Sequence, residues 1–137
     1  MDFSNKTIWI TGASSGIGKA VALKLSKENT NLILSDVNES GLTAVAEACK
    51  KNNCTTVIVP IDLSDEKSVE TAAKGVLDKN LKVDCLYQFA GISQRSLVSE
   101  TPLSVDRKIF EINFFGAIAL TKAILPEMIK MEVVRLL

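Results

Sequence analysis

Thr11-Gly12-Ala13-Ser14-Ser15-Gly16-Ile17-Gly18 decides how this chain folds, because it joins a short β-rich run, residues 7–11, to a helical pattern. Gly12 suits a tight turn out of a strand, and Gly16 and Gly18 let backbone approach a ligand closely. A turn of this kind presents free N–H groups and the positive end of a helix dipole. We therefore expect it to bind a diphosphate.

The rest of the chain repeats the alternation of strand and helix. We expect strands at residues 7–11, 32–34, 56–59 and 83–89. The expected helices bury Ile17, Val21 and Leu25, then Leu42, Val45, Ala46 and Cys49, then Val69, Ala72, Ala73 and Val76. Ser64 is the expected cap of the third helix. A long helix opens at Thr101-Pro102, and Pro126 should kink or stop it.

The strands are continuous apolar runs, which is typical of a sheet covered by helices on both faces. Strand–helix–strand units of this spacing predict right-handed crossovers and parallel strands. We therefore predict an α/β, three-layer, doubly wound Rossmann sheet in the order 3-2-1-4, ending after the fourth strand and its long helix. It forms one incomplete dinucleotide-binding domain over residues 1–137.

Composition excludes several classes of function. Sixteen basic and sixteen acidic residues cancel, which argues against a nucleic-acid or anionic-membrane partner. We expect no secretory signal and no apolar segment near the roughly 20 residues of a membrane span, and hence a cytoplasmic protein. The three cysteines are odd in number and no histidine is present, so no metal site is predicted. The absence of histidine also removes the commonest general base.

A P-loop for nucleoside triphosphates is the nearest alternative for the glycine turn. Gly18-Lys19 supplies its Gly-Lys pair, but Ala20 stands where a magnesium-binding hydroxyl is needed. Ala13 also stands where the first P-loop glycine belongs. The P-loop interpretation therefore fails at two positions.

Asp36 follows the second apolar run, 18 residues after Gly18. A carboxylate at that strand end can accept hydrogen bonds from the ribose hydroxyls of an adenosine, and it would repel a 2′-phosphate. A capping or loop aspartate is the structural alternative. Asp36 therefore favours NAD over NADP, although NADP stays possible.

Together with these features, other short motifs resemble the short-chain dehydrogenase/reductase family. They are Asp62-Leu63, Ala90-Gly91 and Asn113. Residues 90–97 and 120–123 are also similar to one branch of the family, the member 7 dehydrogenase/reductases. The resemblance runs from about Lys6 to Lys130. It implies an NAD(P)-dependent oxidoreductase that moves hydride between nicotinamide and an alcohol or carbonyl substrate.

The resemblance also implies roles for single residues. Those lining the cofactor diphosphate and neighbouring ribose would be Gly12, Ser14, Ser15, Gly16, Ile17 and Gly18. Asp62, with the Leu63 backbone beside it, would accept a hydrogen bond from the adenine amino group. Ala90 and Gly91 would lie under the nicotinamide-side ribose. Asn113 would open the family's Asn-Ser-Tyr-Lys tetrad and hold a water of the proton relay, or act as a structural helix residue.

Two departures from the family pattern stand out. The usual Asn-Asn-Ala-Gly is replaced by Gln88-Phe89-Ala90-Gly91, so other groups must support the fourth strand. The tetrad's serine and its Tyr-x-x-x-Lys have no counterpart, since Tyr87 is the one tyrosine and Gly91 lies four residues on.

We expect the 137 residues to be the N-terminal, cofactor-binding half, inactive alone. The alternative is a truncated, non-catalytic nucleotide-binding or interaction module. The helix over residues 105–130 could support a homo-oligomer.

Overall fold

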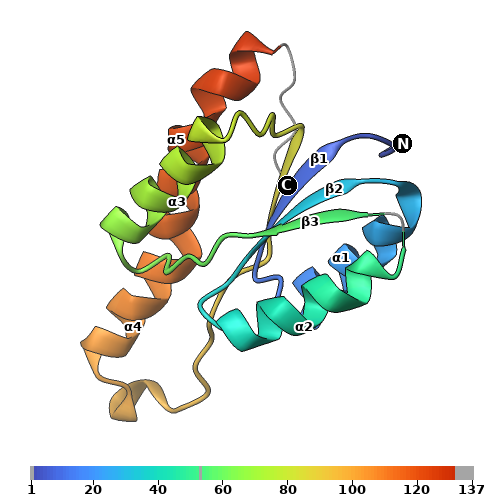
Figure 1. Ribbon diagram of the computed structural model, residues 1–137. Helices are drawn as coiled ribbons and strands as arrows, with labels where there is room; N and C mark the ends of the chain where they lie inside the picture. Colours follow the sequence, from blue (N-terminus) through green and yellow to red (C-terminus); the bar gives the residue numbers. More distant parts are fainter. Residues whose placement is uncertain (1, 53, 132–137) are drawn as a thin grey trace.

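The structure, a computed structural model, describes residues 2–52 and 54–131, so the predicted 1–137 domain extends slightly beyond them. A four-stranded sheet occupies the middle layer (Figure 1). Its strands are β1 (Thr7–Thr11), β2 (Asn31–Ser35), β3 (Thr55–Ile58) and β4 (Cys85–Gln88). All three pairings are parallel and the order is β3-β2-β1-β4, which confirms the predicted doubly wound sheet.

Helices cover both faces of the sheet. On one side lie α1 (Gly16–Leu25) and α2 (Glu39–Lys50), and on the other lie α3 (Glu66–Asp78), α4 (Leu103–Phe110) and α5 (Ala117–Lys130) (Figure 1). A π-helical segment, Glu111–Gly116, joins α4 to α5 without a break. Short 3-10 turns at Ser26–Glu28 and Val98–Glu100 complete the elements.

The pleat of the strands divides the apolar side chains between two cores. Ile8, Ile10 and Leu34 point toward α1 and α2, whereas Trp9 and Ile33 point toward α3 and α5. All five are at most 1% exposed. Burial of each such side chain stabilises the fold by about 1.5–3 kcal/mol before the entropy cost is counted. The uninterrupted apolar runs are thus explained by helices on both faces.

The predicted apolar stripe of α1 is wrong at its first residue. Ile17 is 68% exposed, while the buried residues of this helix are Gly18, Ala22 and Leu25. The first turn of α1 extends past the end of the sheet, so no core lies under Ile17. The buried stripe therefore begins one residue later.

The cap of α3 also differs from the prediction. Asp65 rather than Ser64 is the N-cap, and its carboxylate accepts a 3.0 Å hydrogen bond from the Lys67 amide. Ser64 instead donates its hydroxyl to Asp62. A carboxylate interacts more strongly than a hydroxyl with the positive helix terminus, which explains the exchange.

Pro126 does not stop the last helix at its own position, because α5 continues to Lys130. Buried residues on both sides of the proline, Ile124 and Met128, pack in the same core as α3, and this packing offsets one missing hydrogen bond. The helical run Leu103–Lys130 is long and apolar enough to cross a membrane, by length and composition only. The expectation that no segment approaches that length is therefore wrong.

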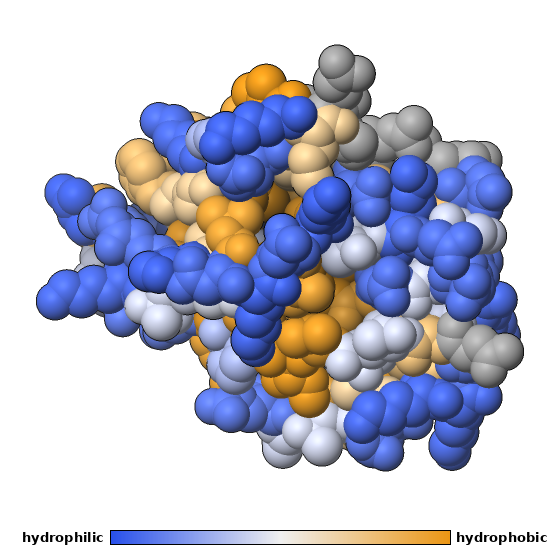
Figure 2. Space-filling model, turned by 45° about the horizontal axis from the view of Figure 1, so that its top comes forward, coloured by the Kyte–Doolittle hydropathy of each residue, from blue (hydrophilic) through white to orange (hydrophobic). Residues whose placement is uncertain are grey.

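Part of this run carries exposed apolar side chains. Phe110 is 61% exposed, Phe114 51% and Ile118 37%. Strand β4 has β1 as its only partner in the described sheet and forms an edge there. Figure 2 shows a face of the molecule on which hydrophobic residues are exposed at the surface between hydrophilic ones.

We predict that the purified chain self-associates through the patch of Phe110, Phe114 and Ile118, because contiguous exposed apolar surface drives association. The double variant Phe110→Glu with Ile118→Lys should raise the monomer fraction measured by light scattering at several concentrations. Val98→Glu is the matched control, since Val98 is 95% exposed but lies outside the patch. A wild-type monomer that persists on concentration would contradict the prediction.

Candidate dinucleotide site

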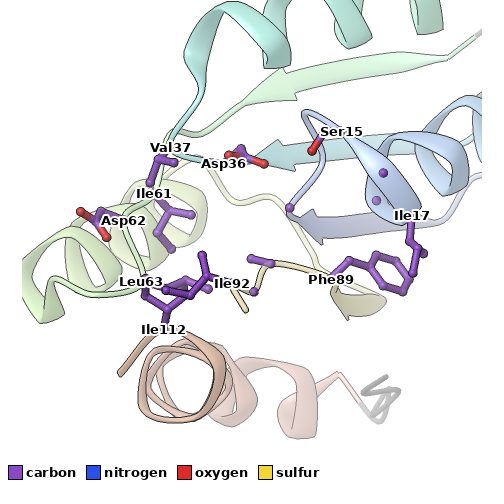
Figure 3. A pocket seen from close by; sticks show the side chains of 15 residues that line it. Ser15, Ile17, Asp36, Val37, Ile61, Asp62, Leu63, Phe89, Ile92 and Ile112 are labelled. Carbon is purple, nitrogen blue, oxygen red and sulfur yellow. The ribbon is translucent and has the colours of Figure 1, made fainter. Parts of the chain in front are cut away.

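A pocket of about 320 Å³ opens at the carboxyl ends of the strands, where ligands bind in doubly wound sheets. Its walls come from the glycine turn and α1, the end of β2, the segment after β3, and the end of β4 (Figure 3). Ten predicted cofactor residues line it: Gly12, Ser15, Gly16, Ile17, Gly18, Asp36, Asp62, Leu63, Ala90 and Gly91. Ser14 and Asn113 do not. The chain thus brings together residues that lie as far as 79 positions apart in sequence.

Close backbone packing shapes the floor of the pocket. Gly12 has φ +68°, and a Cβ added there would lie 2.6 Å from the Ala90 nitrogen. A Cβ on Gly18 would overlap the Gly12 carbonyl oxygen. Because backbone fills these positions, β1, α1 and β4 meet more closely than any side chain permits.

The first turn of α1 leaves room above it. Ser15 is the extended N-cap, with φ −154°, and its side chain makes no capping hydrogen bond. Gly16 has φ +52°, and an added Cβ would meet no atom within 4 Å. The helix therefore offers unpaired N–H groups and its positive dipole end to an open space. This cradle fits the diphosphate of a nicotinamide dinucleotide.

Asp36 is held firmly at the end of β2. Its Oδ2 accepts hydrogen bonds from the Ser14 hydroxyl at 2.8 Å and the Ser14 amide at 3.3 Å. Its Oδ1 accepts from the Asn38 amide at 3.1 Å. Ser14, predicted to line the diphosphate, positions this carboxylate, because its side chain turns from the pocket toward β2. A fourth acceptor site on the carboxylate remains for a ribose hydroxyl.

Asp62 lies beside Ile61 in the segment after β3, which adjoins the end of β2 at the pocket (Figure 3). Its Oδ1 accepts hydrogen bonds from the Ser64 hydroxyl at 2.6 Å and the Ser64 amide at 2.9 Å. These bonds hold the pKa of Asp62 below its usual value, the hydroxyl contributing most. The carboxylate is therefore ionised at neutral pH and can accept a hydrogen bond from an amino group.

Leu63 connects this wall to the π-helical segment. A Cβ on Gly116 would overlap the Leu63 carbonyl oxygen, so the helix backbone rests directly on the pocket wall. The wider turn of a π-helix is often found at functional sites.

Asn113 lies in the π-helical segment and ties it to the chain after β4. Its Oδ1 accepts from the Ile92 amide, and its Nδ2 donates to the Ile92 carbonyl, both at 2.8 Å. Both ends of the side-chain amide are thus used on one backbone unit. Asn113 shapes the pocket through Ile92, which lines it, and the proton-relay role that the resemblance implies stays a prediction.

Comparison with known proteins shows the family. Residues 6–135 match the family model described as short chain dehydrogenase. The chain belongs to the short-chain dehydrogenase family. Dehydrogenase/reductase SDR family member 7 of Homo sapiens is 40% identical over 133 residues, which cover 94% of this chain and 39% of that relative. The chain therefore spans about two fifths of the length of this relative. The relative belongs to the same branch of the family that residues 90–97 and 120–123 resemble.

Solved structures of the short-chain dehydrogenase family show the same fold. L-sorbose reductase from Gluconobacter frateurii, complexed with NADPH and L-sorbose, is similar with a TM-score of 0.88 at 25% identity. The likeness covers 96% of this chain and 51% of the reductase. A metagenomic short-chain oxidoreductase in complex with NADP gives a TM-score of 0.92 at 24% identity, covering 99% and 62% of the two chains.

Gln88 replaces the first asparagine of the family's Asn-Asn-Ala-Gly and still supports β4. Its Nε2 donates to the Thr121 hydroxyl at 2.9 Å, and that hydroxyl donates to the Ala117 carbonyl. Its Oε1 is buried with no hydrogen-bond partner among the described residues. The longer glutamine side chain thus reaches α5, so support for the fourth strand comes from a different group.

Sequence reasoning missed five apolar residues of the pocket, which are Val37, Ile61, Phe89, Ile92 and Ile112. Val37 and Ile61 adjoin the predicted Asp36 and Asp62, and a search along each strand end could have found them. Ile112 adjoins the predicted Asn113, and the π-helical segment brings it to the pocket from a distant part of the chain.

We predict that Gly16→Val abolishes dinucleotide binding while the helix content stays nearly unchanged. The added side chain would stand in the open cradle, and φ +52° is strained for any residue but glycine. Fluorescence titration with NADH and circular dichroism would measure both effects. Gly75→Val is the matched control, because Gly75 lies in α3 with open space around it and does not line the candidate dinucleotide pocket. NADH binding by Gly16→Val equal to wild type would remove the glycine turn as the phosphate site.

Proposed function

We propose that this chain is the cofactor-binding part of an NAD-dependent oxidoreductase, which transfers hydride between nicotinamide and a small alcohol or carbonyl substrate. The observation that carries the proposal is the open cradle at Gly16, set between the fixed carboxylate of Asp36 and the walls at Asp62 and Ala90. A dinucleotide needs a phosphate cradle and a ribose acceptor in this arrangement. Family membership supports an oxidoreductase.

Each part of the pocket has a task in this proposal. The N–H groups at the start of α1 bind the diphosphate. Asp36 binds the adenosine ribose, and Asp62 accepts from the adenine amino group. Ala90 and Gly91 lie under the second ribose. The dinucleotide itself supplies the hydride chemistry, whereas the chain supplies binding and orientation.

The preference for NAD depends on Asp36. Three hydrogen bonds fix its carboxylate, so it cannot turn away from a 2′-phosphate at the same place. Two negative groups in contact repel each other, and solvent screens them only in part at a half-buried site. L-sorbose reductase is complexed with NADPH and the metagenomic oxidoreductase with NADP, so these relatives support a nicotinamide dinucleotide but not the preference for NAD. The residue at the end of β2 supports NAD.

We predict that Asp36→Ala weakens NAD(H) binding by roughly tenfold and narrows or reverses the preference over NADP(H), because a charged hydrogen-bond acceptor is lost. Calorimetric titration of both dinucleotides measures the ratio of affinities. Asp78→Ala makes the same change of charge at an exposed residue of α3 and should leave the ratio unchanged. Wild-type protein that prefers NADP(H) would overturn the assignment.

A second proposal, that the chain alone binds nucleotide without catalysis, is favoured by its one tyrosine. Tyr87 lies in β4 and is 8% exposed, with Gly91 rather than lysine four residues on. Asn113 does not titrate near neutral pH, and both ends of its amide are engaged. No group in the pocket matches the family's proton donor.

We predict that the purified 137-residue chain shows no hydride transfer above the background rate. The general acid–base contribution of about 10²–10⁴-fold is missing without the family's tyrosine and lysine. Absorbance of the reduced nicotinamide, followed with a panel of alcohols and ketones, measures the rate. Turnover that disappears in Tyr87→Phe or Asn113→Ala would contradict the prediction and give that residue a role in proton transfer.

A further inference from the structure

Trp9, the one tryptophan of the chain, makes a buried hydrogen bond beneath the pocket. Its Nε1–H donates to the Ser35 hydroxyl oxygen at 2.8 Å, and both residues are 0% exposed. A buried indole N–H that lacks a partner is costly, so the serine satisfies the one polar group of this side chain. The bond joins the middle of β1 to the last residue of β2.

The backbone of Ser35 also connects the glycine turn, residues 11–18, with Asp36. Its carbonyl accepts a hydrogen bond from the Ala13 amide at 3.1 Å. The next carbonyl, that of Asp36, accepts from the Ile61 amide at 3.2 Å. The end of β2 is therefore held from three directions, and the Trp9 indole reaches it from within the core.

The same indole belongs to the buried cluster beneath a neighbouring part of the pocket wall. Trp9 belongs to the buried cluster that contains Ile61 and Leu63, which both line the pocket. Trp9 itself does not line the pocket, so it would not touch a nucleotide there. One side chain thus connects the residue before Asp36 with the buried cluster beneath Ile61 and Leu63.

We propose that the Trp9–Ser35 pair is a positioning device for the adenosine end of the site. By fixing the end of β2 against the Ile61–Leu63 wall, it sets how strongly the site discriminates between a free and a phosphorylated adenosine ribose. This inference rests on the proposed function, because it assumes that adenosine binds between Asp36 and that wall. It assigns a specificity role to residues outside the pocket.

The test measures the affinity of the chain for ADP-ribose and for its 2′-phosphate by calorimetry. Trp9→Phe removes the N–H donor and keeps an aromatic side chain, whereas Ser35→Ala removes the acceptor. Each variant should weaken ADP-ribose binding by on the order of tenfold, a change within the range of coupling energies between neighbouring groups. Each variant should also bring the affinities for ADP-ribose and for its 2′-phosphate closer together. The double variant should lose little more than either single one, because both changes break the same bond.

Val76→Ala is the control for a general loss of stability. Val76 is 0% exposed in the same cluster, but it lies on α3 and does not line the pocket. It should lower the melting temperature and leave the ratio of the two affinities at the wild-type value. The ratio is the decisive readout, since a purely structural role for Trp9 would not change it.

The failures can be told apart. If the wild-type chain binds both ligands, but Trp9→Phe and Ser35→Ala keep its affinity ratio, the positioning role is overturned and the proposed function stands. The same holds if Val76→Ala changes the ratio as much. If the wild-type chain binds neither ligand, the proposed function falls and the positioning role falls with it.

Discussion

Contact between backbones at the carboxyl edge of the sheet is the constraint on which this structure depends. At Gly12 the end of β1 lies against Ala90, and at Gly18 the first helix lies against Gly12. Neither contact has room for a Cβ atom. The approach brings the N-terminus of α1 over the sheet and aligns the chain after β4 beside it. The pocket is the space left above these contacts, so its position follows from the packing of three elements.

The sequence predicted those features whose cause is local. A glycine turn between an apolar strand and a helix defines the first crossover, and the apolar runs define a sheet covered on both faces. Asp36 could be located because the residue after a parallel strand must lie at the ligand edge. These inferences need the periodicity of one segment at a time, and for that reason the strand order and the pocket edge agree with the structure.

The errors share a different cause, which is the influence of distant segments. Ile17 fits a helical stripe, but no core lies under the first turn of α1. The predicted diphosphate role of Ser14 stays a prediction, but the hydrogen bond from its hydroxyl to Asp36 is a contact that no pattern within its own segment indicates. Pro126 would end an isolated helix, but α5 is packed against α3 on both sides of it. Ile112 and Asn113 reach the pocket region through a π-helical turn, and sequence periodicity does not predict that turn.

The contact between Gly116 and Leu63 has a consequence for how inherited or engineered variants of this chain are interpreted. Gly116 lies in a helical segment and does not line the candidate dinucleotide pocket, yet its lack of a side chain sets the distance between that helix and the pocket wall. Any larger residue must displace one of the two. A survey that scores substitutions by their distance from a bound ligand would rank Gly116 as tolerant of substitution. Its contact with the Leu63 backbone instead makes Gly116 one of the least replaceable positions in the chain.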